Sequence, residues 1–143
     1  MLNEPLVKRL HLTEPEIEGH ADEVRHEIIR RSMLYRKKLP PTAVKGKSAI
    51  VIDDGLASGY TMLAAVKSLR HRKVAEITVA VPVASGSAYD LVLPQVDHLI
   101  CLIVARTSLF AVASFYQHWH DLNDQDVINL LESWHRRSLA LTR

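Results

Sequence analysis

One stretch constrains the fold more than any other, because an apolar run there ends in two acids and a loop of small residues. The run Ile50–Ile52 is followed by Asp53, Asp54 and the glycine-spaced loop 55–61. A helical spacing of apolar residues begins directly after the loop. Strand, turn and helix in this order build a ligand site at the carboxyl end of a parallel strand. We therefore expect an α/β domain organised around residues 50–61.

The acids and the loop predict two parts of one ligand site. Adjacent carboxylates repel unless hydroxyls or a cation satisfy them, and vicinal ribose hydroxyls would do so, with or without Mg²⁺. Glycines allow a left-handed φ and a close approach of the backbone to a ligand, and amides at a helix N-terminus favour an anion. The pattern therefore predicts a ribose 5-phosphate site, with Ser58 and Thr61 as hydroxyl donors. The predicted site residues are Asp53, Asp54, Gly55, Leu56, Ala57, Ser58, Gly59, Tyr60 and Thr61.

Other interpretations share some of these residues. The P-loop of an ATP-hydrolysing protein needs a lysine where Tyr60 stands, which argues against that class. Phospho-acceptor domains also bind Mg²⁺ with an acid pair, but their phosphorylated aspartate lies on a separate strand and the run after the acids is not glycine-spaced. An ordinary polar turn is the remaining interpretation, and two adjacent acids at a strand end are costly there without a ligand.

Residues 50–61 resemble the phosphoribosyl-pyrophosphate motif of type I phosphoribosyltransferases. The shared order is apolar strand, Asp-Asp, Gly, small residues, Thr or Ser, Gly, any residue and Thr. Ser58 stands where threonine is commoner, and Tyr60 stands where a small residue is commoner. Further segments are similar to a stand-alone subgroup of this family: Arg30-Arg31, Tyr35-Arg36, Phe110, Phe115-Tyr116 and Asp124-Gln125-Asp126-Val127.

The resemblance implies a mainly parallel sheet flanked by helices and a transferase of the glycosyltransferase class. Its reaction would move the phosphoribosyl group of phosphoribosyl pyrophosphate to a nitrogenous base, with Mg²⁺ neutralising the pyrophosphate. Asp53 and Asp54 would hold the ribose hydroxyls, and residues 55–61 would hold the 5-phosphate. Further candidates for binding the pyrophosphate are Arg30, Arg31 and Arg36, in the basic half of a helix predicted at 14–36. A solvated basic face is the alternative for these three arginines.

The family's earlier strand, whose loop binds pyrophosphate, has no counterpart here. In the subgroup it lies upstream of the segment that resembles Leu2-Asn3-Glu4, so we expect an N-terminally truncated domain. The sheet would then have an open edge at strand 48–53, which invites pairing with another chain. A homo-oligomer, or a partner that supplies the missing strand, would complete a split enzyme. The remaining alternative is a non-catalytic regulatory module that binds a ribose phosphate or a nucleoside monophosphate.

Composition sets further bounds. The 143 residues are expected to form one domain, with a helical segment at 1–47, an α/β core at 48–105 and an aromatic segment with a helix at 106–143. The net charge of +2 does not favour a nucleic-acid partner. No signal peptide or membrane-length apolar run is visible, so we expect a cytoplasmic protein without a membrane partner. A single cysteine, Cys101, excludes an internal disulfide, and we expect it to be buried in a strand.

The remaining elements follow from periodicity and caps. We expect a short turn or helix at 5–12 and helices at 14–36, 61–72, between a turn at 85–87 and Pro94, and after Asn123. The long helix begins at a Thr13–Glu16 capping box and stops at 39–41. Asn123 with Asp126 caps the last helix, and residues 136–143 are expected to be a frayed basic tail. Strands are expected at 48–53, 76–82 and 98–103, the second covered on both faces.

The aromatic residues after position 105 leave two interpretations open. Phe110, Phe115, Tyr116 and Trp119 either pack as a cluster that closes the core or form a stacking wall for a planar base. His118, His120 and Asp121 meet on one side only if the chain there is extended, so metal binding is the less favoured interpretation. The roles of Phe115, Tyr116, His118 and His120 are not assigned by the sequence.

Overall fold

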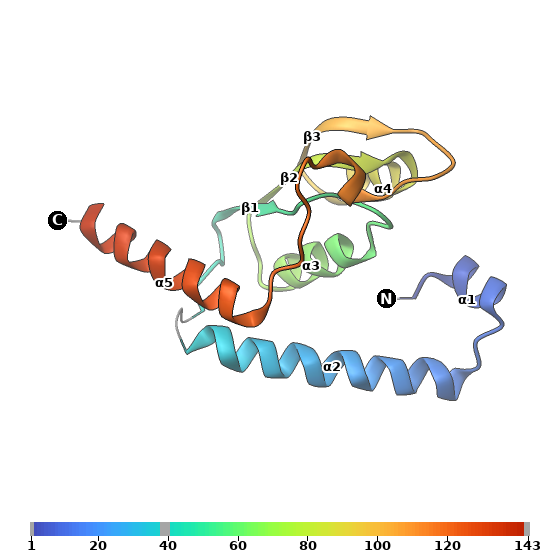
Figure 1. Ribbon diagram of the computed structural model, residues 1–143, viewed down its shortest axis with the longest axis horizontal. Helices are drawn as coiled ribbons and strands as arrows, with labels where there is room; N and C mark the ends of the chain where they lie inside the picture. Colours follow the sequence, from blue (N-terminus) through green and yellow to red (C-terminus); the bar gives the residue numbers. More distant parts are fainter. Residues whose placement is uncertain (1, 38–40, 142–143) are drawn as a thin grey trace. The chain divides into compact units, whose positions relative to one another are not determined.

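The computed structural model describes residues 2–37 and 41–141, which form two compact units (Figure 1). Residues 43–119 make up the first, here called the sheet unit. Residues 2–42 and 120–143 make up the second, here called the helical unit. None of the helices described is both long and apolar enough to cross a membrane.

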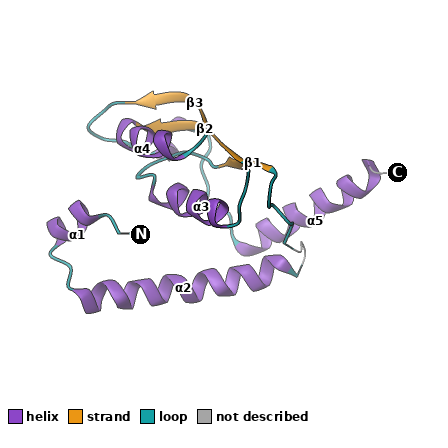
Figure 2. Ribbon diagram, turned by 180° about the vertical axis from the view of Figure 1, so that it is seen from behind, coloured by secondary structure: helices purple, strands orange, loops and turns teal. Residues whose placement is uncertain are grey.

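The sheet unit has a parallel sheet of three strands in the order β1-β2-β3, as Figure 2 shows in orange. The strands are β1 (Ser48–Ile52), β2 (Glu76–Ser85) and β3 (His98–Ala105). The helix α3 (Tyr60–His71) connects β1 to β2, and α4 (Gly86–Val92) connects β2 to β3. Short 3₁₀ turns follow at Leu93–Gln95 and Val112–Phe115. The predicted α/β class with a mainly parallel sheet is therefore confirmed.

One face of this sheet carries the core. Alternate residues of β2, among them Ile77 and Val79, are fully buried and pack in one cluster with Val66 of α3 and Val92 of α4. Both connecting helices cover the same face because successive right-handed crossovers in one direction lie on one side of a sheet. The core therefore forms between that face and the two helices.

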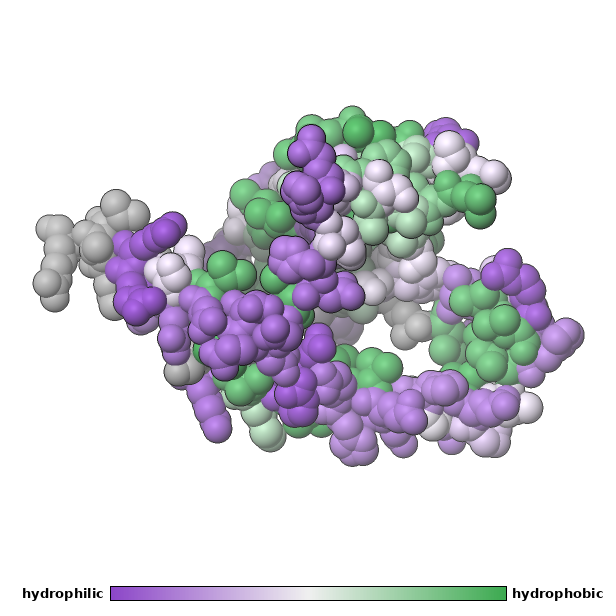
Figure 3. Space-filling model, viewed as in Figure 1, coloured by the Kyte–Doolittle hydropathy of each residue, from purple (hydrophilic) through white to green (hydrophobic). Residues whose placement is uncertain are grey.

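The opposite face of the sheet is open. Ile52 of β1 is 77% exposed and Leu102 of β3 is 78% exposed, and Figure 3 shows apolar side chains gathered along β3. The expectation that strand 76–82 is covered on both faces was therefore wrong, since those residues alternate between half-buried and buried, and only the last three residues of β2 are buried in succession. Among the described residues β1 pairs with β2 alone, so the predicted open edge is present.

The helical unit consists of α1 (Glu4–Leu10), α2 (Glu14–Arg36) and α5 (Asp124–Leu141). The predicted capping box is formed, because the amide of Thr13 donates to the Glu16 carboxylate at 2.8 Å. α2 ends at Arg36, and of its predicted stop at 39–41 the first two positions lie outside the described residues.

The predicted cap of α5 is also formed. The side-chain oxygen of Asn123 accepts from the amide of Asp126 at 3.0 Å, and the Asp126 carboxylate accepts from the amide of Asn123 at 3.1 Å. The helix then continues to Leu141, so the prediction of a frayed tail was wrong over 136–141. Those residues are mainly good helix formers, with no glycine or proline to end the helix. Residues 142 and 143 lie outside the described chain.

Cys101 lies on β3, as predicted, but is only half-buried against the core. Its thiol donates to the carbonyl oxygen of Ile103 at 3.2 Å, and burial raises the pKa of the thiol. A thiol with a raised pKa is a poor nucleophile, which agrees with a packing role.

Candidate functional site

The acid pair lies where β1 ends. The amide of Asp53 donates to the carbonyl oxygen of Ala80 in β2 at 3.4 Å. Asp53 is half-buried, whereas Asp54 is exposed. The amide of Asp54 donates to the Asp53 carboxylate at 3.0 Å. Burial raises the pKa of Asp53, the bond from the Asp54 amide opposes this rise, and the charge of Asp54 adds to it. The two carboxylates therefore differ in solvation although they are adjacent in sequence.

The loop after the acids is attached to the end of β2. The amide of Leu56 donates to the carbonyl of Val83, and the Leu56 carbonyl accepts from the amide of Ser85, both at 2.9 Å. The Ser85 hydroxyl adds a bond of 2.7 Å to the carbonyl of Ala57. Sequence reasoning assigned Ser85 only to a turn. The available signal was a serine directly before a short helix, which is typical of an N-cap.

The two glycines of the loop have different roles. Gly59 has a φ of +78° at the start of α3, a left-handed conformation that glycine adopts readily, as predicted. Gly55 does not have a left-handed φ. A Cβ at Gly55 would lie 2.7 and 2.8 Å from the methyl groups of Val112, so the absent side chain makes room for another part of the protein. The expected left-handed φ at Gly55 was therefore wrong, and the expected approach of a ligand to its backbone stays a prediction.

A pocket of about 280 Å³ opens over the acids and the loop. It contains every predicted motif residue except Tyr60, whose hydroxyphenyl group is outside the lining. It also contains Met62 and Val112, which sequence reasoning did not place there, and Trp119, for which a stacking wall was one of two open interpretations. The lining consists of Asp53, Asp54, Gly55, Leu56, Ala57, Ser58, Gly59, Thr61, Met62, Val112 and Trp119.

Aromatic residues from the segment after β3 border this pocket. The Tyr116 hydroxyl donates to the carbonyl oxygen of Asp54 at 2.7 Å. The rings of Tyr116 and Trp119 meet edge to face, with centroids 5.2 Å apart. Phe110 and Phe115 form a separate pair with centroids 5.5 Å apart. Tyr116 and Trp119 therefore belong to the pocket's surroundings.

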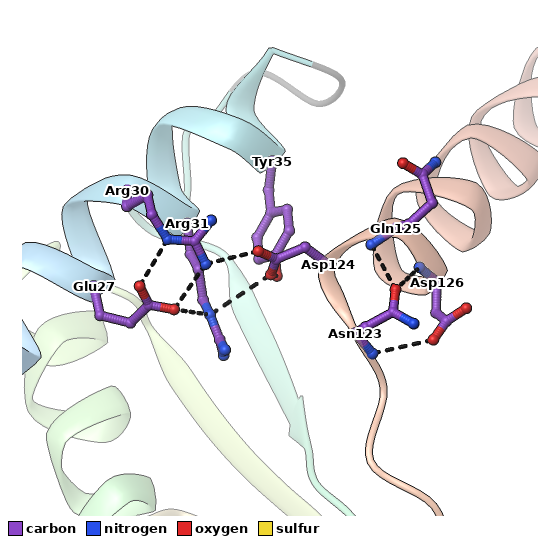
Figure 4. Close-up of polar contacts among 8 residues, drawn as sticks. All are labelled: Glu27, Arg30, Arg31, Tyr35, Asn123, Asp124, Gln125 and Asp126. Carbon is purple, nitrogen blue, oxygen red and sulfur yellow. Dashed lines mark hydrogen bonds and ion pairs between the residues drawn. The ribbon is translucent and has the colours of Figure 1, made fainter.

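The structure gives two of the candidate arginines carboxylate partners within the helical unit (Figure 4). Arg30 donates to Glu27 at 2.7 and 2.8 Å and to Asp124 at 2.6 Å, and Arg31 donates to Glu27 at 2.6 Å. Tyr35 also donates to Asp124, at 2.6 Å. These bonds lower the pKa of Glu27 to about 2, with Arg30 as the largest cause, and lower that of Asp124, with Tyr35 as the largest cause.

Arg36, the third candidate, is exposed at the last position of α2. Within the described chain, no three His, Cys, Asp or Glu side chains converge on one point as a metal site would require. The carboxylate oxygens of Asp53 and Asp54 are nevertheless the type of ligand that Mg²⁺ prefers. These two residues could hold Mg²⁺ only together with oxygens from a ligand or water.

Comparison with known proteins gives one family match. Residues 9–114 match the phosphoribosyl transferase domain family. The matched range includes the acid pair, the loop and Val112, and it ends before Tyr116 and Trp119.

Two relatives come from Mycobacterium tuberculosis, strains CDC 1551 / Oshkosh and ATCC 25618 / H37Rv. They are provisionally named phosphoribosyl transferases MT0597 and Rv0571c, and each is 26% identical to this chain over 136 residues. The alignment covers 95% of this chain and 30% of each relative. The crystal structure of TT1426 from Thermus thermophilus is similar, with a TM-score of 0.74 and 29% identity. It covers 86% of this chain, which spans 58% of the Thermus chain.

Proposed function

Because this chain belongs to the phosphoribosyl transferase domain family, we propose that its pocket binds phosphoribosyl pyrophosphate and that the domain transfers the phosphoribosyl group to a nitrogenous base. The observation that carries the proposal is the lining of the pocket. Two carboxylates, Asp53 and Asp54, lie beside a loop that leads into the N-terminus of α3. Carboxylates accept hydrogen bonds from sugar hydroxyls, and a helix N-terminus favours a phosphate.

The proposed reaction is a displacement at the anomeric carbon. A ring nitrogen of the base forms the new C–N bond and loses its proton, while the C–O bond to pyrophosphate breaks and pyrophosphate leaves with the electron pair. Positive charge develops on the sugar, where the negative charges of Asp53 and Asp54 would stabilise it. The loop 55–61, with the hydroxyls of Ser58 and Thr61, would anchor the 5-phosphate. Holding both ends of the sugar would align the anomeric carbon with the base.

Mg²⁺ would supply charge neutralisation for the leaving pyrophosphate. The protein's contribution to its binding would be the carboxylate oxygens of Asp53 and Asp54, with the remaining ligands from the pyrophosphate and water. Arg30, Arg31 and Arg36 are weaker candidates for contacting the same anion. The first two already have carboxylate partners, so an anion would have to compete with Glu27 and Asp124.

The second candidate is a module that binds a ribose phosphate or a nucleoside monophosphate without catalysis. It is favoured by the lining of the pocket, in which the described residues include no lysine or arginine to balance the charge of pyrophosphate. A third candidate is one part of a split enzyme, completed at the open edge of β1 by a second copy or by a partner strand. Light scattering measures the oligomeric state, and a strict monomer would contradict completion by a second copy.

Calorimetric titration with phosphoribosyl pyrophosphate and Mg²⁺ tests the proposal. We expect the native chain to bind and Asp53→Asn/Asp54→Asn to lose at least tenfold in affinity, because its amides carry no charge to balance Mg²⁺ and the ribose hydroxyls. Asp22→Asn/Asp121→Asn is the matched control, since it removes two exposed carboxylates from the helical unit.

If the native chain and the acid variant bind equally well, the assigned site is contradicted. If the folded native chain does not bind, the proposed function is contradicted. A screen of bases for pyrophosphate release then separates the first two candidates. A non-catalytic module should bind a nucleoside monophosphate as well and release no pyrophosphate with any base.

A further inference from the structure

One wall of the pocket comes from outside the motif. Residues 112–119, here called the aromatic segment, follow β3 and lie over the acids. Val112 packs into the space left by Gly55, and Trp119 lines the pocket. Between them, the Tyr116 hydroxyl donates a hydrogen bond of 2.7 Å to the carbonyl oxygen of Asp54. The ring of Tyr116 contacts the ring of Trp119, with centroids 5.2 Å apart. Tyr116 therefore connects the acid pair to the wall.

We propose that Tyr116 is a positioning residue of this pocket, which orients the Asp54 peptide and holds Trp119 in place as a wall beside the ribose. The proposal deepens the proposed function and rests on it. Tyr116 itself is not among the residues that line the pocket, so it acts through Asp54 and Trp119. It lies beyond residue 114, where the match to the family ends, so the family match assigns it no role.

The hydrogen bond of Tyr116 controls a peptide plane at the site. Since a peptide group is planar, fixing the carbonyl of Asp54 also fixes the direction of the next amide, that of Gly55. On its other side, the amide of Asp54 is bonded to the Asp53 carboxylate at 3.0 Å. Asp54 is therefore held on both sides of its Cα, which sets the direction in which its exposed side chain leaves the backbone.

The ring of Trp119 is held against the ring of Tyr116. Trp119 is 43% exposed and Tyr116 is 37% exposed. The edge-to-face contact between these rings is a preferred aromatic geometry, and it transmits the position of the Tyr116 ring to Trp119. Loss of the hydroxyl should therefore loosen Trp119 as well as the Asp54 peptide.

The other end of the pocket does not depend on Tyr116. The loop that would hold the 5-phosphate is attached to β2 by the bonds of Leu56 and by the Ser85 hydroxyl on Ala57. A change at Tyr116 should therefore weaken contacts to the ribose and leave contacts to the phosphate intact. A general loss of folding would weaken both.

The test uses Tyr116→Phe, which removes only the hydroxyl, with ribose 5-phosphate and inorganic phosphate as probes. Loss of one hydrogen bond predicts a roughly three- to tenfold weaker affinity for ribose 5-phosphate, with the affinity for phosphate changed less than about twofold. Tyr89→Phe is the matched control, because it removes a tyrosine hydroxyl from α4, outside the pocket lining. It should leave both affinities unchanged.

Fluorescence reports on Trp119 directly. The chain has two tryptophans, so Trp134→Phe leaves Trp119 as the only one. In this background Tyr116→Phe should shift the emission of Trp119 to longer wavelength, because a looser ring is more exposed to water, and should reduce its response to ribose 5-phosphate. Tyr89→Phe should change neither signal.

Two failures can be distinguished. If the native chain does not bind ribose 5-phosphate, the proposed function is overturned and this inference with it. If the native chain binds and Tyr116→Phe matches it in affinity and in Trp119 emission, only the role of Tyr116 is overturned. Should Tyr116→Phe not fold, Trp119→Phe tests the same wall from the other ring, and an unchanged affinity for ribose 5-phosphate would overturn the inference.

Discussion

The hydroxyl of Ser85 donates a hydrogen bond of 2.7 Å to the carbonyl oxygen of Ala57, and it also accepts from the amide of Ala88 at 3.1 Å. One side chain therefore joins the motif loop to the N-terminus of α4. The same residue pairs with Ala105 of β3 through its backbone. The conformation of the loop therefore depends on contacts with the end of β2 as well as on its own residues.

Ser85→Ala should destabilise the fold by about 1–2 kcal/mol, because α4 loses its N-cap and the Ala57 carbonyl loses a donor. It should also weaken binding of inorganic phosphate, because the loop amides become less ordered. Urea unfolding and calorimetry measure the two effects. Ser68→Ala, at an exposed position of α3, is the control and should be neutral or slightly stabilising. Unchanged stability in Ser85→Ala would contradict the capping role.

The elements of this fold were largely predictable because their signals are local. The capping box at Thr13 and the apolar periodicity predicted a helix at 14–36, which is where α2 lies. The resemblance carried by residues 50–61 was confirmed by the family match and by the Thermus structure. β2 was predicted to end at Pro82 but continues to Ser85, because Val83, Ala84 and Ser85 pair with β3. That pairing is long-range, and the local sequence Ser-Gly-Ser indicated a turn instead.

Only part of the pocket lining was predictable. The acids and the loop follow one another in sequence, and the structure brings them to one pocket. Val112 and Trp119 also line that pocket, although they lie more than fifty positions after the loop in the sequence. No local sequence pattern indicates a contact between residues so far apart in the chain. The contact of Gly55 with Val112 could not be predicted for the same reason, since Val112 comes from the aromatic segment. These assignments to a ligand site remain predictions.

Gly55→Ala should destabilise the sheet unit by roughly 1–3 kcal/mol. Its Cβ would lie 2.7 Å from Val112 and 3.0 Å from Val83, closer than packed carbon atoms tolerate, so the aromatic segment would have to move. The affinity for ribose 5-phosphate should fall as well, because Val112 lines the pocket. Denaturant unfolding and calorimetry measure the two quantities.

A second substitution identifies the cause. Val112→Ala removes the clashing methyl groups, so Gly55→Ala/Val112→Ala should be more stable than the sum of the two single changes predicts. Additive losses would contradict the assigned contact. Gly19→Ala is the matched control, because nothing lies within 4 Å of its Cβ on α2, and it should stabilise the chain by about 0.5–1 kcal/mol.

Asp53 should give the stability a dependence on pH that its amide variant lacks. Its pKa in the folded chain is raised above the ordinary value of 3.8, chiefly by burial. The folded state therefore binds this proton more tightly than the unfolded state, and the resulting stability is present below pH 3.8 and lost as the pH rises through the raised pKa. Asp53→Asn should consequently be more stable than the native chain at neutral pH.

The measurement is the free energy of unfolding of both chains from acidic to neutral pH. The advantage of Asp53→Asn should grow with pH over the window above 3.8 and then stay constant. An advantage that does not change with pH would mean that the carboxylate is not responsible. Asp22→Asn, an exposed change on α2, controls for the loss of one charge.

Glu27 should act with the opposite sign. Arg30 and Arg31 lower its pKa from 4.5 to about 2, so the stability it contributes is present above pH 4.5 and lost as the pH falls towards 2. Glu27→Gln should therefore be less stable than the native chain at neutral pH and nearly equal to it at about pH 2.

Because these groups are exposed, salt at about 1 M should reduce the difference at neutral pH. Circular dichroism of thermal unfolding measures it, with Glu18→Gln as an exposed control on the same helix. An equal loss in both variants would show that the ion pairs of Glu27 do not contribute.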